Sequence, residues 1–187
     1  MQTEDLTEYN NSWYKTGKNP LIRVLLYFTN LIVVRNRYQP ICYPKLVCLR
    51  LFGAKIGKRV VVKPGVNIKY PWKLSVGDNT WIGEGVWIDN LSMVMIGKNC
   101  CLSQGVMLLC GNHRYDRPQF DLEIKPIVLE DGVWIGAGTM VCPGCIAQTH
   151  AVVGAMSLAV GVIKPFSIYR GNPAVFIKQR IIRQAEI

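Results

Sequence analysis

Three consecutive rows of twenty residues decide the fold: AKIGKRVVVKPGVNIKYPWK from Ala54, LSVGDNTWIGEGVWIDNLSM from Leu74 and VMIGKNCCLSQGVMLLCGNH from Val94. Aliphatic residues occupy three columns of each row, six residues apart, and a glycine falls between the second and third columns. The columns hold Ile56, Val76 and Ile96; Val62, Ile82 and Leu102; and Ile68, Ile88 and Leu108. After one interruption, the six-residue spacing resumes at Leu129, Ile135, Val141, Ala147, Val153 and Ala159.

A six-residue period distinguishes strands from helices. Six residues advance an α-helix by about 600°, so successive aliphatic side chains would point in three directions, whereas on extended chain an even period keeps them on one side. The pairs Pro64-Gly65, Glu84-Gly85 and Pro143-Gly144 suit the turns between strands. We therefore expect three short strands in each coil, and stacked coils that bury a column of aliphatic side chains.

Length and charge set further limits. The chain has 187 residues, half of them apolar, which suits one domain with a buried core. Lys and Arg number 22 against 12 Asp and Glu, a formal charge of +10. This excess is typical of proteins that meet phosphate, anionic polysaccharide or a membrane surface, and we expect no nucleic-acid partner. Eight cations and no acid lie between Leu21 and Val60: Arg23, Arg35, Arg37, Lys45, Arg50, Lys55, Lys58 and Arg59.

Cysteine usage and the start of the chain bear on the compartment. The seven cysteines are irregularly spaced, and the chain starts with the polar segment MQTEDLTEYN, which favours a reducing, cytoplasmic setting. The apolar run from Leu21 to Val34 is fourteen residues long and contains Arg23 and Asn30, whereas a membrane span needs about 20 residues. We expect a core-facing or interfacial helix, with peripheral association at the inner face of the membrane through the basic N-terminal region.

Three parts follow from these patterns. Residues 1–54 are expected to form a loose polar arm (1–20) and a helical cap, with one helix over 21–36 that starts after Asn19-Pro20 and a short one over 38–50. The cap covers the open end of the first coil. Residues 55–170 form the β-helix, with a loop insertion at 111–126. Residues 171–187 are expected to form a helical tail, because apolar residues between 174 and 184 recur at helical spacing.

Several strings resemble a known family. The hexapeptide pattern from Ile56 to Ala159, the string YRGNPA at 169–174 and the segment Gly111-Asn112-His113 resemble the left-handed parallel β-helix acyltransferases. LFGAKIG at 51–57 and WIDN at 87–90 are similar to the colanic acid type, related to galactoside and maltose O-acetyltransferases. The resemblance covers residues 45–180. The left hand of the coil comes from this resemblance, since the period fits either hand.

The resemblance implies a fold and an activity. The fold is all-β, a single-stranded left-handed parallel β-helix (a hexapeptide-repeat solenoid) with an N-terminal helical cap and a short C-terminal helix. The activity is O-acetyl transfer from acetyl-CoA to a sugar hydroxyl of a bacterial exopolysaccharide or its precursor. A homotrimer is implied as the working unit, and no metal is expected.

The repeat has one long interruption. Ile96 and Leu129 lie 33 residues apart where 20 are expected, so an insertion occupies CGNHRYDRPQFDLEIKP at 110–126. Solenoid insertions gather on one face, often the functional one. This insertion contains His113, and an imidazole there is suited to removing the proton of an attacking hydroxyl near neutral pH. The resemblance implies the same catalytic role for His113.

A neighbouring acceptor is expected to fix the tautomer of His113. Three acids in the insertion are equal candidates for this role: Asp116, Asp121 and Glu123. We expect direct attack of the hydroxyl in a ternary complex, with a backbone N–H stabilising the oxyanion. A covalent acyl intermediate on Cys110 is the second route.

Small residues spaced eighteen apart indicate the coenzyme site. The segments IGAG at 135–138 and VGAM at 153–156 stack on one face, where Gly136 and Gly154 allow a pantetheine arm to pass close to the backbone. The resemblance places Trp134, Ala137 and Ala155 against that arm. It also places cations for the coenzyme phosphates at the end of the repeat: Lys164, Arg170, Lys178 and Arg180.

The acceptor is expected near His113, in a cleft completed by a neighbouring subunit. Five side chains are candidates to hydrogen-bond sugar hydroxyls: Asp89, Asn90, Asn112, Tyr115 and Asp116. A turn explains Asp89 and Asn90 equally well. Outward tryptophans are candidates for stacking on a sugar or for subunit contacts: Trp72, Trp81 and Trp87.

Other interpretations compete with this one. Cys142-Pro143-Gly144-Cys145 has redox or half-zinc spacing, but it falls on a turn of the repeat and has no second pair. The zinc carbonic anhydrases of this fold resemble a three-histidine site, which His113 and His150 alone cannot supply. A small antibiotic or free sugar is an alternative acceptor. A non-catalytic solenoid that docks on membrane or anionic glycan is the alternative outside enzymes.

Overall fold

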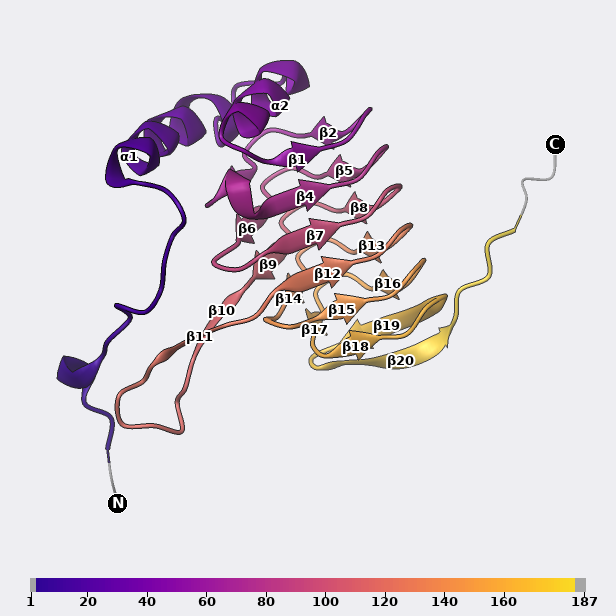
Figure 1. The fold of residues 1–187 in the computed structure, drawn as a ribbon. Helices are drawn as coiled ribbons and strands as arrows, with labels where there is room; N and C mark the ends of the chain where they lie inside the picture. Colours follow the sequence, from indigo (N-terminus) through magenta and orange to yellow (C-terminus); the bar gives the residue numbers. More distant parts are fainter. Residues whose placement is uncertain (1–2, 184–187) are drawn as a thin grey trace.

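The structure, a computed structural model that describes residues 3–183, is a parallel β-helix capped by helices at its N-terminal end (Figure 1). Short strands from successive coils stack in parallel into three sheets, here called A, B and C, and one antiparallel strand, β20, completes sheet B. Sheet A contains β1 (Lys55–Ile56), β4 (Leu74–Val76), β7 (Val94–Ile96), β12 (Ile127–Leu129), β15 (Ile146–Ala147) and β18 (Val162–Ile163). Sheet B contains β2 (Val61–Val62), β5 (Trp81–Ile82), β8 (Cys101–Leu102), β13 (Trp134–Ile135), β16 (Val152–Val153), β19 (Ser167–Gly171) and β20 (Ala174–Gln179). Sheet C contains β3 (Asn67–Ile68), β6 (Trp87–Asp89), β9 (Met107–Leu109), β14 (Met140–Val141) and β17 (Leu158–Ala159).

The strand register confirms the predicted columns. Val62 lies beside Ile82, and Ile82 beside Leu102. Across the interruption, Leu102 continues to Ile135, and the eighteen-residue rows then pair Ile135 with Val153. The column is buried from end to end, with Val62, Ile82 and Leu102 each 1% exposed. The aliphatic positions found in the sequence therefore form the core.

Positive backbone angles turn the chain between sheets B and C. Gly65, Gly85 and Gly105 have φ of 73°, 67° and 66°, a region that costs side-chain-bearing residues energy. We call this edge of the coil the B/C corner, and the other two edges the A/B and C/A corners. Gly144 of the predicted Pro143-Gly144 turn has φ 79° at the C/A corner.

The helical cap matches its prediction. Helix α1 (Pro20–Thr29) starts after Asn19, whose side chain accepts a hydrogen bond from the Ile22 N–H, and it continues into a π-helical turn, η2 (Asn30–Val34). Helix α2 (Cys42–Leu51) covers the first coil, and its Cys42 Sγ accepts a bond from the Val62 N–H at 3.1 Å. Within residues 3–183, no helix has both the length and the apolarity that crossing a bilayer requires.

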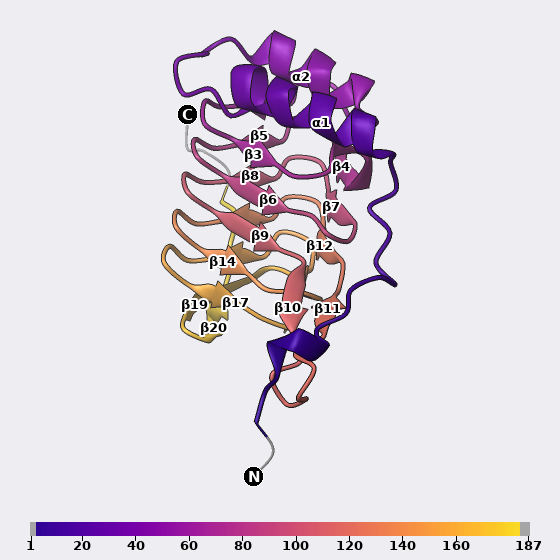
Figure 2. The same cartoon turned by 90° about the vertical axis from the view of Figure 1, so that its left-hand side faces the viewer.

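The N-terminal arm is not loose, which corrects the prediction. The arm runs from α1 along the coil to the insertion (Figure 2) and contains one short helix, η1 (Leu6–Glu8). The Trp72 indole, beside η3 (Pro71–Lys73), donates to the Thr16 carbonyl at 2.7 Å, and the Tyr14 hydroxyl donates to the Leu91 carbonyl at 2.9 Å. Hydrogen bonds from the polar tips of these two aromatic side chains therefore hold the arm against the coil, although its polar composition is typical of a solvated tail.

The predicted C-terminal helix is wrong. Residues Ala174–Gln179 form β20, antiparallel to β19, after the two-residue connection Asn172-Pro173. The edge of β19 offers unpaired backbone groups that a strand can satisfy, whereas an isolated ten-residue helix is marginal in water. Residues 180–183 follow β20 without regular structure, and residues 184–187 of the predicted tail lie outside the described part of the chain.

Candidate active site

The insertion leaves the C/A corner of the third coil as a β-hairpin. Strand β10 (Gly111–His113) pairs antiparallel with β11 (Leu122–Ile124), and His113 lies opposite Leu122. The Arg114 N–H donates to the Asp121 carbonyl at 2.8 Å and extends the ladder towards the tip. Backbone pairing thus holds His113 at a fixed place on a hairpin that projects from the coil (Figure 1).

A backbone carbonyl and an aromatic ring orient His113. Its Nδ1 lies 2.9 Å from the Phe120 carbonyl oxygen. The imidazole and the Phe120 ring are stacked, with centroids 4.4 Å apart and planes 5° apart. Because a carbonyl oxygen only accepts, Nδ1 carries a hydrogen, and in the neutral ring Nε2 then keeps its lone pair. An imidazole in this tautomer can accept a proton from a hydroxyl at Nε2.

None of the three predicted acids is the partner of His113. The Glu123 carboxylate pairs with Lys125 Nζ at 2.9 Å, and Asp116 is exposed at the hairpin tip. Asp121 contributes its backbone carbonyl to Arg114. The hairpin turn, in which Phe120 has φ 51°, aims the carbonyl at the ring and so takes over the role expected of a carboxylate.

The N-terminal arm lies against the same hairpin, which the sequence analysis missed. The Tyr9 ring is 5.8 Å from the His113 ring, centroid to centroid. The Asp5 N–H donates to the Pro118 carbonyl at 3.0 Å, and Gln119 Nε2 donates to Glu8 at 3.1 Å. Tyr9 was the one signal in the sequence for this contact, because an aromatic side chain in a polar segment is stabilised when it packs against another part of the protein.

The predicted acceptor residues do not form one group. Asn90 is fully buried, and its side-chain amide bonds both peptide groups of Tyr70, accepting at 2.9 Å and donating at 2.6 Å. It is therefore a structural residue, which corrects its assignment to the acceptor. Asp89 pairs with Lys69 Nζ at 2.9 Å and keeps a partly exposed side chain. Its position at the end of β6 is one coil from the root of the hairpin.

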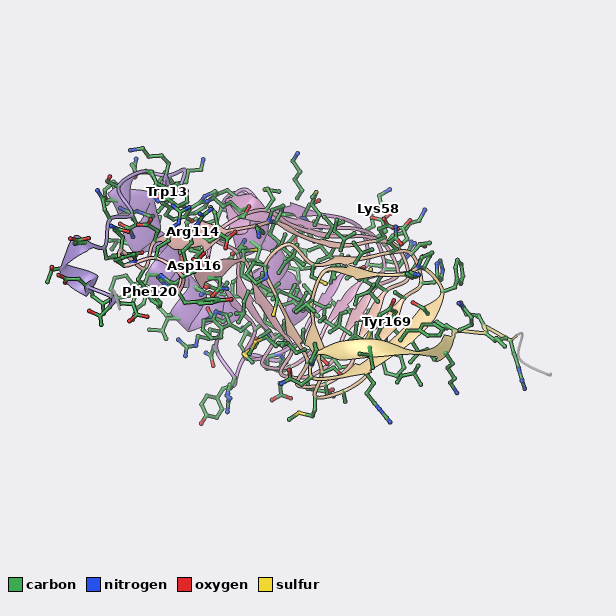
Figure 3. All side chains as sticks on the ribbon, turned by 90° about the horizontal axis from the view of Figure 1, so that it is seen from below. Trp13, Lys58, Arg114, Asp116, Phe120 and Tyr169 are labelled. Carbon is green, nitrogen blue, oxygen red and sulfur yellow. The ribbon has the colours of Figure 1, made fainter. Side chains whose placement is uncertain are left out.

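The other three predicted acceptor residues belong to the hairpin. Tyr115 and Asp116 are exposed at its tip. Asn112 is exposed too, but strand alternation turns it to the face opposite His113. Figure 3 shows Arg114, Asp116 and Phe120 together at this end of the molecule, with Lys58 and Tyr169 towards the opposite end.

Most of the predicted coenzyme residues meet at the B/C corner of the fourth and fifth coils. The Gly136 N–H donates to the Val153 carbonyl at 2.8 Å, so the two glycine segments stack as expected. Ala137 is partly exposed and Ala155 is exposed. Arg170 packs over Gly154, where an added Cβ would lie 3.2 Å from its Cγ. The result is a row of small residues at this corner with one cation beside it.

Trp134 precedes this row of small residues on β13 of sheet B. Its side chain is 47% exposed, and its indole N–H donates to the Ser103 hydroxyl at 2.9 Å. Lys178, on β20 opposite Ile168, is exposed at the end of the same sheet.

Two predicted phosphate ligands lie elsewhere. Arg180 donates from its guanidinium to the carbonyls of Gly132 and His150, both at 3.0 Å, so it fastens the A/B corner. Lys164 is exposed in the turn between β18 and β19, also at the A/B corner. The resemblance placed these cations together, but the sheet B strand separates the A/B corner from the B/C corner. We therefore withdraw the coenzyme role of Arg180, whose guanidinium binds two backbone carbonyls, within one protomer, whereas the role of Lys164 stays a prediction.

Cys110 and Cys145 are poor nucleophiles. Cys110 is fully buried, and burial raises the pKa of its thiol to about 11. This argues against the acyl-cysteine route. Burial likewise raises the pKa of Cys145, in the Cys-Pro-Gly-Cys turn, to about 12. Over residues 3–183, no three His, Cys, Asp or Glu side chains gather as metal ligands.

No family model matches the chain, but the similar proteins found by comparison are named acetyltransferases. A protein of Escherichia coli K12, provisionally named colanic acid biosynthesis acetyltransferase WcaF, is 41% identical over 133 residues, which cover 71% of this chain and 73% of that protein. Galactoside O-acetyltransferase of the same strain is 26% identical over 129 residues, covering 67% of this chain and 64% of that protein. A Vibrio cholerae hexapeptide-repeat acetyltransferase solved with acetyl-CoA has a similar fold, with a TM-score of 0.77 at 22% identity, over 87% of this chain and 88% of that one.

Proposed function

The chain belongs to the hexapeptide-repeat acetyltransferases, enzymes that take their acetyl group from acetyl-CoA, and we propose that it acetylates a sugar hydroxyl of a bacterial exopolysaccharide or its precursor, with His113 as the general base. The observation that carries the catalytic assignment is the bond from His113 Nδ1 to the Phe120 carbonyl, which in the neutral imidazole selects the tautomer with a free lone pair on Nε2. The choice of acceptor follows the name of the relative from Escherichia coli.

The reaction then needs one base and no covalent enzyme intermediate. Nε2 of His113 takes the proton of the sugar hydroxyl as its oxygen attacks the thioester carbonyl carbon. The tetrahedral oxyanion collapses, the carbon–sulfur bond breaks, and the leaving thiolate takes the proton from the imidazolium. The Phe120 carbonyl stabilises the imidazolium that forms, as a carboxylate does in other His-dependent enzymes.

Acetyl-CoA is proposed to lie along the B/C corner of the fourth and fifth coils. Gly136 and Gly154 keep that corner narrow, so pantetheine can reach backbone groups beside Ala137 and Ala155. Trp134 would border the arm, and Arg170 and Lys178 are exposed cations on sheet B that could bind the phosphates.

For the acceptor, Asp89 and the hairpin-tip residues Tyr115 and Asp116 are proposed to contact the sugar. Asp89 is partly exposed at the root of the hairpin, and carboxylate oxygens accept hydrogen bonds from sugar hydroxyls. Asn112 would contact a sugar only from the face opposite His113.

A homotrimer is proposed as the working unit. In one protomer, His113 projects from the C/A corner, whereas the small residues proposed to hold the coenzyme lie at the B/C corner. A neighbouring copy would supply the second half of each site. Light scattering should give three chains per particle. Mixing inactive His113→Ala chains with inactive Ala155→Trp chains should restore transfer if sites are shared, and no restoration would contradict shared sites.

Peripheral membrane association is also proposed, at the inner face of the membrane of a cytoplasmic enzyme. An apolar stripe follows α1 and η2 at helical spacing: Leu21, Val24, Phe28 and Ile32, which are 77%, 55%, 54% and 63% exposed. Anionic vesicles should carry the protein in flotation, and Val24→Asp/Phe28→Asp should abolish this. Leu6→Asp, at a 67% exposed residue of the arm, is the control. Flotation unchanged in the double variant would exclude this surface.

Two assays test the proposed function. Coenzyme A should raise the Tm of the protein, whereas a non-catalytic solenoid would show no shift. A screen with labelled acetyl-CoA should then find transfer to oligosaccharides in preference to free sugars, chloramphenicol or a macrolide. Transfer only to the small acceptors would replace the polysaccharide assignment with the antibiotic or sugar alternative, and a Tm unmoved by coenzyme A would contradict the enzyme assignment.

A further inference from the structure

A groove separates the helical cap from sheet C of the first two coils. Its inner part is a cavity of about 320 Å³, within the usual size range of ligand sites. We call it the α1 groove and define it by Arg23, Tyr27, Arg35, Lys69, Tyr70 and Trp87. A second hollow of about 600 Å³ continues it and shares Arg35, Asn67 and Trp87. The groove is therefore elongated and has aromatic walls.

The charge of the α1 groove is positive. Its one carboxylate, Asp89, is paired with Lys69 Nζ at 2.9 Å. Within the described residues, neither Arg23 nor Arg35 forms an ion pair. Arg37 adds a further cation in the outer hollow. Thirteen of the 22 Lys and Arg residues lie between Tyr9 and Gly77, a segment without Asp or Glu. Free guanidinium groups bind carboxylate and phosphate oxygens in bidentate geometry.

The groove exists before any ligand binds. Asn30 Nδ2 donates to Asn67 Oδ1 at 2.8 Å and fastens the cap to β3. Leu26 and Val34, on the inner side of the same helical segment, are buried at 6% and 2% exposure. A ligand would therefore not have to order these walls, which lowers the cost of binding.

The groove also leads to the candidate active site. Asp89, at the edge of the groove, pairs with Leu109 in the next coil. After Cys110, the chain continues into β10, which carries His113. Strands in adjacent coils are about 4.8 Å apart, so the groove and the hairpin root are separated by one or two such steps. Figure 2 shows α1 and the hairpin on the side of the coil that carries β3, β6 and β9.

We infer that the α1 groove binds an extended, negatively charged saccharide through Arg23 and Arg35, with sugar rings against Trp87 and Tyr70. Its role as the acceptor site rests on the proposed function; binding itself does not. The shared chemistry is an oxyanion on a sugar unit, either a uronic acid carboxylate or a phosphate ester. A small uncharged acceptor would use neither the length nor the charge of the groove.

Calorimetry on the full chain, without acetyl-CoA, tests this inference. The probes are a tetrasaccharide of alternating glucuronic acid and N-acetylglucosamine, its carboxyl-reduced form, and maltotetraose with and without a phosphate ester. We expect the acidic probes to bind at least tenfold more tightly than their neutral forms, and more weakly as salt rises. Preference between the two acidic probes identifies the oxyanion. Equal binding of acidic and neutral probes would overturn the inference.

Variants locate the site. Arg35→Gln should weaken binding of the preferred acidic probe at least tenfold, and Arg35→Lys should weaken it less, because the charge remains but the bidentate geometry is lost. Lys58→Ala removes one charge from the A/B corner and is the matched control. Equal losses in Arg35→Gln and Lys58→Ala would show a general charge effect and overturn the assignment to the groove.

The outcomes separate the groove from the proposed function. Binding of the acidic probe without acetyl transfer to any acceptor would leave the groove standing and contradict the enzyme's proposed acceptor class. Acetyl transfer to an oligosaccharide, together with equal binding of the acidic and neutral probes, would leave the proposed function standing and contradict the groove.

Discussion

Replacing Phe120 with alanine should slow catalysis by weakening the orientation of His113. The substitution keeps the backbone carbonyl 2.9 Å from Nδ1 but removes the ring that stacks at 4.4 Å on the imidazole. An aromatic pair contributes about 0.5–1.5 kcal/mol beyond its buried area. If that energy orients the base, kcat should fall about 2- to 12-fold. The KM for acetyl-CoA should not change, because the proposed coenzyme site is at another corner of the coil.

Steady-state assays of thiol release with the best acceptor from the screen measure this effect. Phe120→Tyr keeps the ring and should retain the wild-type kcat. In a His113→Ala background, Phe120→Ala should have no further effect, because the two residues act as one unit. A kcat unchanged in Phe120→Ala would refute the orienting role of the ring. An equal loss in both backgrounds would show that Phe120 acts on something other than His113.

Three other predictions concern stability. Gly136→Ala should destabilise the fold by about 1–3 kcal/mol, since its Cβ would lie 2.5 Å from a backbone nitrogen of the next coil; Gly154→Ala meets only a flexible side chain and should cost less in thermal melts. Asn90→Ala should cost about 1–3 kcal/mol by leaving the Tyr70 peptide groups unsatisfied, and a selective rise in acceptor KM at unchanged Tm would instead restore Asn90 to the acceptor site. Burial raises the pKa of Cys145 from 9.0 to about 12. As pH rises, the thiol therefore ionises in the unfolded chain before it ionises in the folded protein. The contribution of the buried, protonated thiol to the free energy of unfolding is complete below pH 9 and is lost as pH rises towards 12. The wild-type Tm should fall more than that of Cys145→Ala between pH 8 and 10.5.

The architecture of the coil could be predicted because residues that recur at the sequence period lie directly above one another in the stacked coils. A column such as Val62, Ile82 and Leu102 has one position per coil, and the register of sheet B repeats that spacing. The hand of the coil was not available from the period. The C-terminal segment was misassigned because apolar residues there suit either a helix or an edge strand, and the deciding factor was the open edge of β19.

The candidate base was predictable, but its surroundings were not. His113 stood out because the insertion interrupts a regular repeat. Its partner is a backbone carbonyl, which every residue possesses, so no side chain signalled it. Tyr9 reaches His113 from more than one hundred residues away in sequence, a contact that periodicity does not encode. Likewise, Arg180 looked like a phosphate ligand until its guanidinium was found on two backbone carbonyls.

Acetyl transfer by His113→Ala, measured beside coenzyme A binding, tests the central claim most directly. Loss of the general base should lower kcat about 10²- to 10⁴-fold, while the Tm shift caused by coenzyme A remains. His150→Ala is the matched control, because this second histidine stacks on Phe166 and bonds Thr149 at the A/B corner. We predict transfer within a few-fold of wild type for that control. Transfer by His113→Ala within tenfold of wild type would contradict the assignment of His113 as the base.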